Sequence, residues 1–305
     1  MRFLLVFAAV LGTALSASAQ KTFSTKQPKS LVQLQITLRQ RLYLPGEAIE
    51  VDIAILNNSG GALTFKPEDG WLDFTVWNMV KPTGEGNPVP KVKPIFINET
   101  FTVKHTESAR ATVDLSTGFD LARHGLYRVQ ASMVYPGATA AITAEAVTLN
   151  VVPGYKLSEL EFGLPHAEAG VTPESRKYSL QRITLTEIRE MRLYVSVTDP
   201  AEETIFRQVR LGRVAGNDAP PTRLDRLSNL HVLHQIDARV FTHTTVSPRG
   251  DILLRESYES LGSRPGFKVD DEGRVSVSGG VRRARADDIL PLKAEAAPGK
   301  PTPAP

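Results

Sequence analysis

Histidines are the most recognisable chemical groups of this chain, and three of the six lie in one short stretch. His231 and His234 have the H-x-x-H spacing of many zinc sites, and Asp237 and His243 follow closely. On a helix, residues three apart are neighbours and can bind one ion. The surrounding residues instead follow a strand pattern, which sends residues three apart to opposite faces of a sheet. We therefore predict no divalent metal at His231, His234 or His243, although His243 could meet one of the other two.

The acidic candidates are three consecutive residues, Asp270, Asp271 and Glu272, and a separate one, Asp225. A glycosidase holds two carboxylates roughly 5–10 Å apart across a cleft, whereas consecutive acids on a turn point in different directions. The spacing also differs from the alternating D-x-D-x-D-G pattern of a calcium loop. These acids are therefore interpreted as turn residues that face water.

The sequence contains none of the usual contexts of a catalytic nucleophile or a phosphate-binding loop. It has no G-x-S-x-G elbow, no persuasive S-x-x-K site, no Walker A loop and no G-x-G-x-x-G after a strand. Cysteine is absent, which excludes a thiol nucleophile, Cys-ligated zinc, disulfides and a lipid anchor on a cysteine. We therefore predict no catalytic residue, no cofactor and no enzymatic activity.

Two tryptophans are the candidates for a binding surface. Trp71 and Trp77 lie six residues apart on an expected strand over 71–79, so they should share a face. Paired aromatic side chains on one face can stack on sugar rings. They can equally belong to the core of a β-sandwich or cover it, because aromatic side chains bury large areas. Both interpretations stay open.

The elements expected to carry these residues are β-strands, because polar and apolar residues alternate with period two. In the first strand, Val32, Leu34, Ile36 and Leu38 share one face. Seven or eight such strands, separated by turns, favour an antiparallel sandwich. The expected strands cover 31–38, 49–55, 71–79, 100–103, 109–115, 126–135 and 141–152.

Two motifs of this segment resemble bacterial immunoglobulin-like (Ig-like) domains. A Y-L-P-G-E turn at 43–47 opens a strand that ends at Asn57, and G-L-Y-R-V at 125–129 begins a late strand. The pattern is similar to the proteinase-inhibitor-like type of Ig-like domain and covers residues 30–153. The resemblance implies an Ig-like antiparallel β-sandwich in which Tyr127 points inward. The cysteine pair of antibody domains is missing.

The second half contains a faint internal repeat. Residues 224–232 align with 269–277, so that Asp225 and Asp270 lie 45 positions apart, within the spacing of four-stranded propeller blades. The D-x-x-G-x-V turn at Asp270 resembles turns of NHL-type β-propellers. About 110 residues make two to three blades, whereas closed propellers have four to eight. The resemblance implies a β-meander of two to three blades, left open or completed by self-association, and a plain antiparallel sheet remains the alternative.

The start of the chain has the layout of a cleaved secretory signal peptide. Arg2 precedes an apolar run over 3–11, and Ala17 and Ala19 provide small residues before Gln20. We therefore predict a secreted or periplasmic protein cleaved after Ala19. The expected all-β organisation is a signal peptide (1–19), an Ig-like β-sandwich (30–153), a linker (154–176), a propeller-like β-meander (177–290) and a disordered Pro/Ala-rich tail (291–305).

Charge and hydropathy narrow the classes of partner. The 36 basic and 33 acidic residues give a net charge of +3, which argues against nucleic acid as the principal partner. No later segment has the roughly 18 consecutive apolar residues of a membrane span. The sequence favours a non-catalytic secreted or envelope protein that acts in binding or assembly. The alternatives are an inhibitor of an extracytoplasmic proteinase, with the loop over 83–90 as its contact, or a glycan-binding accessory module.

Overall fold

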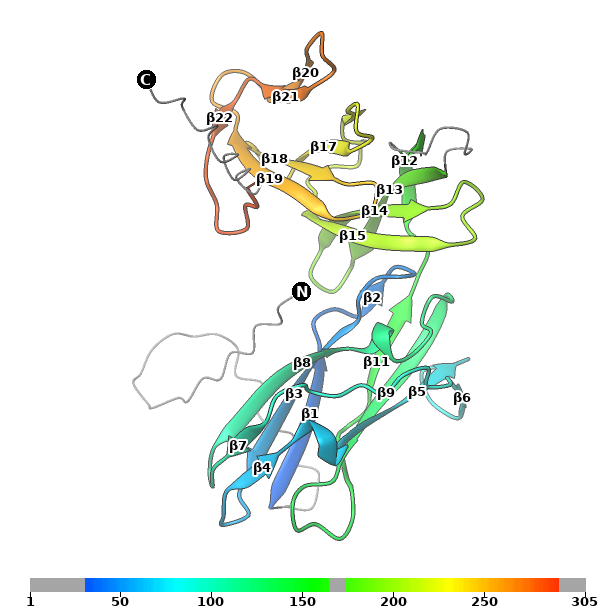
Figure 1. Ribbon diagram of the computed structural model, residues 1–305, viewed down its shortest axis with the longest axis vertical. Helices are drawn as coiled ribbons and strands as arrows, with labels where there is room; N and C mark the ends of the chain where they lie inside the picture. The colour runs from blue at the N-terminus through cyan, green and yellow to red at the C-terminus, as the bar shows by residue number, and fades with distance from the viewer. Residues whose placement is uncertain (1–30, 165–173, 291–305) are drawn as a thin grey trace, which may run out of the picture. The chain divides into compact units, whose positions relative to one another are not determined.

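A computed structural model describes residues 31–164 and 174–290, and these residues form an all-β protein. The chain divides into two compact units between Pro153 and Gly154, called unit 1 and unit 2 below (Figure 1). Within the described ranges, no helix is both long and apolar enough to cross a bilayer. The predicted signal peptide (1–19) and tail (291–305) lie outside the described residues.

Unit 1 is built from short strands and two single-turn 3-10 helices. They are β1 (Val32–Leu38), β2 (Leu42–Tyr43), β3 (Glu50–Asn57), β4 (Leu63–Phe65), η1 (Pro67–Asp69), β5 (Leu72–Met79), β6 (Gly86–Pro88), β7 (Phe101–Val103), β8 (Ser108–Asp114), η2 (Leu115–Thr117), β9 (Gly125–Met133), β10 (Ile142–Thr143) and β11 (Val147–Val151).

Two sheets of unit 1 enclose one hydrophobic core (Figure 1). The three-stranded sheet has the order β1-β3-β8, and the six-stranded sheet has the order β2-β11-β9-β5-β6, with β10 paired to β9. Strands β4 and β7 form a separate pair. In β1 and β3, buried and half-buried residues alternate, as the sequence predicts. The alternation follows from the period of two, because every second side chain of a strand points into the core.

Tyr127 lies near the start of β9 and is 1% exposed, which confirms the prediction that it points inward. Its hydroxyl donates a hydrogen bond of 2.8 Å to the carbonyl of Arg123, four residues upstream. This bond fixes the corner that leads into β9. Burial is the main cause that raises the pKa of Tyr127, so the ring stays neutral and keeps its hydroxyl proton.

In the part of unit 2 that the structure describes, every regular element is a β-strand. They are β12 (Tyr155–Gly163), β13 (Ser175–Leu185), β14 (Glu190–Thr198), β15 (Ile205–Arg213), β16 (Thr222–Leu224), β17 (Leu230–Gln235), β18 (Val240–Val246), β19 (Ile252–Glu259), β20 (Gly266–Val269), β21 (Val275–Ser278) and β22 (Val281–Arg282).

Each large sheet of unit 2 is an antiparallel meander. The four-stranded sheet runs β12-β13-β14-β15, and the five-stranded sheet runs β16-β17-β18-β19-β22. Apolar side chains from both sheets form one core. Successive four-stranded meanders that share a core resemble the blades of a β-propeller. Strands β20 and β21 form a separate hairpin.

The predicted linker over 154–176 is wrong for most of its described residues. Residues 155–163 form β12, which pairs with β13 and belongs to the first meander. The ring of Phe162 stacks on Tyr178, with 4.2 Å between the ring centroids. A register shift between Lys156 and Ser158 interrupts the alternation of β12, which hides the strand from a search for period two. Unit 2 therefore begins with β12, well before residue 177.

Candidate functional site

Asp225 and Asp270, which define the sequence repeat, occupy the same position in two turns of the same kind. In each turn, the Asp carbonyl accepts a hydrogen bond from the amide three residues on, and that residue has a positive φ (Ser228 +58°, Gly273 +73°). The Oδ1 atom of each Asp accepts a 2.8 Å bond from the amide four residues on. The two carboxylates therefore cap turns, as predicted for turn residues.

Ser247 caps a third turn of this kind. Its carbonyl accepts from the amide of Gly250, at φ +83°, and its hydroxyl accepts from the amide of Asp251 at 3.0 Å. A serine here hides the recurrence from a comparison of sequence letters, although the backbone pattern is the same. The turn explains why β18 and β19 follow each other so closely.

His231 and His243 meet on one face of the five-stranded sheet, called the outer face below. The register pairs His231 with Thr245 and Leu233 with His243, so the two histidines are diagonal neighbours. His231 Nδ1 lies 3.0 Å from His243 Nε2, and the two rings stack with centroids 5.2 Å apart. The sequence by itself leaves this contact open. Sheet register decides it, because β17 and β18 place these side chains on the same side.

Asp225 determines which ring nitrogen of each of the two histidines carries the hydrogen. Its Oδ2 atom lies 3.4 Å from His231 Nε2, and a carboxylate can only accept. His231 Nε2 therefore carries hydrogen, His231 Nδ1 accepts, and His243 Nε2 donates to it. The hydroxyl of Thr245 lies 3.2 Å from His231 Nδ1. The chain ends at His243 Nδ1, which is buried and has no hydrogen-bond partner among the described residues.

Burial decides the charge of these groups. It is the main cause that lowers the pKa of His231, and the neighbouring Asp225 carboxylate offsets part of this effect. Burial, and then the His231 ring, lower the pKa of His243 to about 3. Burial by itself would raise the pKa of Asp225, but hydrogen bonds from Asn229 and His231 hold it below its ordinary value. At neutral pH the pair is therefore uncharged beside an ionised carboxylate.

The β20–β21 hairpin covers the histidine pair. Phe267 of β20 meets His243 edge-on with ring centroids 5.4 Å apart, and His231 at 6.3 Å. Arg226 joins the two Asp turns, since its guanidinium donates to the carbonyl of Asp271 at 3.0 Å. Thr245, His231 and Asp225 follow the order of a hydroxyl, a base and an orienting carboxylate. All but Asp225 are buried under the hairpin, so this set works as an internal hydrogen-bond chain.

His234 lies on the opposite face of the same sheet, called the core face, as its spacing from His231 predicts. It is 1% exposed, and a hydrogen bond with the backbone of Arg213 favours its charged form. Burial, and then the charge of Arg255, lower the pKa of His234 to about 4. Within residues 31–164 and 174–290, no three His, Asp or Glu side chains come together in a geometry that could hold a metal ion.

Trp71 and Trp77 do not form a common platform. Trp71 is only 6% exposed and packs against Phe65 and Phe101, with ring centroids 4.7 Å and 5.6 Å away. The prediction of a shared face is wrong because Trp71 precedes β5, whose regular alternation starts at Leu72. Trp71 belongs to the core of unit 1, which removes the sugar-stacking interpretation.

Trp77 instead supports the hairpin formed by β5 and β6. The guanidinium of Arg128 lies over its ring, 4.8 Å from the centroid, and donates a 3.1 Å bond to the carbonyl of Gly84. Strand β6 pairs with the end of β5 from Trp77 to Met79. The connection over 80–85 is exposed, and Val80 at its start is 85% exposed. The sequence predicts a loop over 83–90, but neither β6 nor the contact of Arg128 with Trp77 is visible in it.

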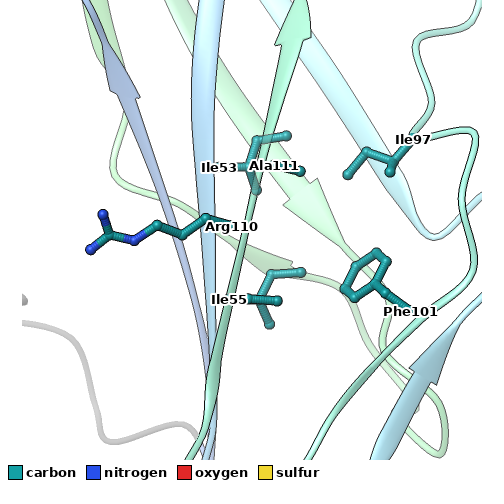
Figure 2. A pocket seen from close by; sticks show the side chains of 7 residues that line it. Ile53, Ile55, Ile97, Phe101, Arg110 and Ala111 are labelled. Atoms are coloured by element: carbon teal, nitrogen blue, oxygen red, sulfur yellow. The ribbon is translucent and has the colours of Figure 1, made fainter. Parts of the chain in front are cut away.

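A small gap lies inside the sandwich of unit 1. A cavity of about 10 Å³ is lined by Ile53, Ile55, Ile97, Phe101, Ala109, Arg110 and Ala111. Figure 2 shows the apolar side chains turned toward the gap from two sides, while the Arg110 side chain points away. Ligand pockets usually measure roughly 300–1,000 Å³, so this gap is a packing defect rather than a ligand site.

Comparison with known proteins adds little. No family model matches the chain, and no curated protein matches it. Three solved structures show weak similarity: the sporulation control protein Spo0M from Bacillus subtilis (12% identity, 60% of this chain and 91% of that chain, TM-score 0.29), a family 123 glycoside hydrolase from Clostridium perfringens (12%, 41% and 27%, 0.23) and a DUF4784 family protein from Bacteroides caccae (9%, 83% and 86%, 0.20). At these TM-scores the similarities support no conclusion about function.

Proposed function

We propose that this chain is an exported, non-catalytic protein that binds a partner protein through the β5–β6 hairpin of unit 1. The observation that carries the proposal is the exposed tip over 80–85, held on a fixed base. Val80 offers an apolar side chain that is 85% exposed, followed by Lys81 and Pro82. Exposed loops that a rigid scaffold holds in place are where binding residues are most often found.

The base of the hairpin favours tight binding because it limits the motion of the tip. Arg128 ties the connection to β5, since it stacks on Trp77 and binds the carbonyl of Gly84. Gly86 allows the strands to approach closely, because a Cβ atom there would lie 2.3 Å from the sulfur of Met79. A contact loop that is ordered before binding loses less conformational entropy when it binds.

Strand order and one hydrogen bond support an Ig-like assignment for unit 1. The order β11-β9-β5-β6 opposite β1-β3-β8 corresponds to the G-F-C-C′ and A-B-E arrangement of Ig-like sandwiches. The bond from the Tyr127 hydroxyl to the Arg123 carbonyl corresponds to the tyrosine corner of that fold. The proteinase-inhibitor-like type remains a proposal that rests on the motifs at 43–47 and 125–129.

For unit 2 we propose an assembly role as an open pair of propeller-like blades. The two meanders and the recurring turns at Asp225, Ser247 and Asp270 support this assignment. The NHL type rests on the D-x-x-G-x-V motif alone. Export rests on residues 1–19, and mass spectrometry of the mature protein should find Gln20 at its N-terminus.

Capture of partners from a cell-envelope extract tests the proposal. The wild-type chain should retain a specific protein, and Val80→Asp should lose most of it because a charge would enter an apolar contact. Val92→Asp is the matched control, since Val92 is 66% exposed in the same unit but lies outside the hairpin. Equal retention by both variants would contradict the role of the hairpin.

The hairpin also favours one specific class of partner, an extracytoplasmic proteinase. An inhibitor must insert an exposed, rigid segment into the cleft of the enzyme, and the tip over 80–85 has both properties. In this second candidate function, the captured partner is a proteinase and the purified chain inhibits it stoichiometrically. A partner without proteolytic activity would exclude the inhibitor role and leave the binding role intact.

A further inference from the structure

The β20–β21 hairpin depends for its order on the side chains beneath it. No strand residue of this hairpin is fully buried. Phe267 packs against the rings of His231 and His243, and the carbonyl of Asp271 accepts a hydrogen bond from Arg226. An isolated two-stranded hairpin is marginally stable at best in water. The contact of Phe267 with the histidine pair is therefore needed to keep the hairpin folded.

The histidine pair accommodates one extra proton but not two. In the neutral pair, His243 Nε2 donates to His231 Nδ1 at 3.0 Å. A protonated His231 can donate to Asp225 and to a neutral His243 at the same time. With a second proton, two N–H groups face each other across 3.0 Å, and two positive rings stack with centroids 5.2 Å apart. Like charges this close in a buried place disfavour the doubly protonated pair.

The charged groups of the sheet leave the second proton without a counter-charge. Asp225 already supplies the counter-charge of the first proton. Glu256 lies opposite His243 between β18 and β19. Its carboxylate accepts a 2.7 Å bond from the Tyr258 hydroxyl and lies 3.5 Å from Arg282 Nε. These surroundings agree with the pKa of His243, which burial and then the neighbouring ring lower to about 3.

The groups that the hairpin and its approach bring to the pair do not favour a second proton either. The side chain that faces the rings is the uncharged Phe267, and Lys268 points to the other face of the hairpin. Arg264, just before the hairpin, lies over the ring of Phe241, 5.3 Å from its centroid, and adds positive charge on the outer face. The acids of the hairpin turn pair with an arginine of the same turn: Asp270 and Glu272 with Arg274.

We propose that the His231–His243 pair is a pH-sensitive latch, which holds the β20–β21 hairpin closed until both rings are protonated. Release of the hairpin moves the rings into water, where both can carry a charge. The hairpin has a hinge at its base, since Gly279 and Gly280 directly follow β21 with φ of +77° and +66°. Opening at this hinge exposes the outer face of the five-stranded sheet.

The direction of the pH dependence follows from the pKa of His243. This pKa is about 3 in the closed state, whereas a solvated histidine has a pKa of about 6.5. The closed state is therefore fully favoured above pH ~6.5, and it becomes less stable relative to the open state as the pH falls. Between pH 7 and pH 5 the open fraction should rise roughly 20-fold through His243 alone.

Hydrogen exchange of the full chain tests the latch, with each rate divided by the rate of an unstructured chain at the same pH. In the wild-type chain, protection of the amides over 266–278 should be lower than in β13 and β14, and it should fall roughly 20-fold from pH 7 to pH 5. His243→Gln removes the second proton and should lose most of this dependence. His234→Gln is the matched control on the core face of β17 and should keep it.

Phe267→Ala tests the anchor itself, and it should remove the protection over 266–278 already at pH 7. Protection over 266–278 that equals that of β13 and β14 would overturn the proposal, because the hairpin would then open only when unit 2 unfolds. So would a wild-type protection that is the same at pH 7 and pH 5, or an unchanged pH dependence in the His243→Gln chain. None of these results depends on the β5–β6 hairpin, so the latch and the proposed function are tested separately.

Discussion

Tyr127 shows how one residue connects the sequence motif to the stability of unit 1. Its ring is buried in the core, and its hydroxyl closes the corner to Arg123. Tyr127→Ala should lower the free energy of unfolding by about 2–5 kcal/mol, the usual cost of removing a large buried side chain. Tyr127→Phe removes only the hydrogen bond and should cost about 1 kcal/mol. Urea unfolding of both variants checks this order, and an unchanged midpoint for Tyr127→Ala would contradict the register of β9.

Acidification should destabilise unit 2 through its buried histidines. The folded pKa values of His234 (about 4) and His243 (about 3) lie below the ordinary value of about 6.5. Between these pKa values, the two histidines are protonated in the unfolded chain but stay neutral in the folded chain. The stability that depends on the two neutral histidines is fully present above pH ~6.5. It is lost as the pH falls toward the folded pKa values, at up to roughly 1.4 kcal/mol per pH unit for each histidine.

Urea midpoints across this pH window, for the wild-type chain and His243→Gln, measure the effect. The variant should show a shallower decline, because one titrating group is removed. His105→Gln is the control, since His105 belongs to unit 1 and contacts the exposed amide of Gly60. A wild-type stability that does not change between neutral and mildly acidic pH would contradict the burial of these rings.

At the residue scale, the sequence predicted what local geometry determines. The opposite faces of His231 and His234 follow from the period of a strand alone. The contact between His231 and His243 depends on the register of two strands, which a single sequence does not specify. The predicted face of Trp71 was wrong because side chains alternate between two faces only within a regular strand, and β5 begins at Leu72.

The hairpin of β5 and β6 is the element on which the proposed function depends. Gly86→Ala should open it, because the new Cβ atom would lie 2.3 Å from Met79 Sδ and 2.9 Å from the carbonyl of Asn78. We expect faster amide hydrogen exchange over 80–88 and weaker partner capture. Gly61→Ala is the matched control, since nothing lies within 4 Å of its added Cβ atom. Unchanged exchange in the Gly86→Ala chain would show that close approach of the strands is unimportant.

Turns were easier to predict from sequence than strand ends. The Asp225 and Asp270 turns were found because they repeat a letter pattern, and the structure gives them the same hydrogen bonds. The expected linker was wrong for the opposite reason, because its turn-forming residues follow a bulged strand. Long-range pairing with β13 overrides the local signal in β12.

At the scale of the whole molecule, the start of unit 2 can be tested with two fragments. A fragment over 154–290 keeps β12 and should unfold in one cooperative transition. A fragment over 177–290, which follows the sequence-based boundary, loses β12 and leaves Tyr178 without Phe162. It should unfold at a clearly lower temperature in circular dichroism. Equal unfolding temperatures would mean that β12 adds nothing to the core of unit 2.

The central claim, that the β5–β6 hairpin contacts a partner outside the cytoplasm, is tested most directly by site-specific photo-crosslinking. A photoreactive residue at position 80 of the exported chain should give one dominant adduct in intact cells. The same residue at position 92, exposed on unit 1 but away from the hairpin, should give little or none. No adduct at position 80, or the same adduct in equal yield at position 92, would contradict the account.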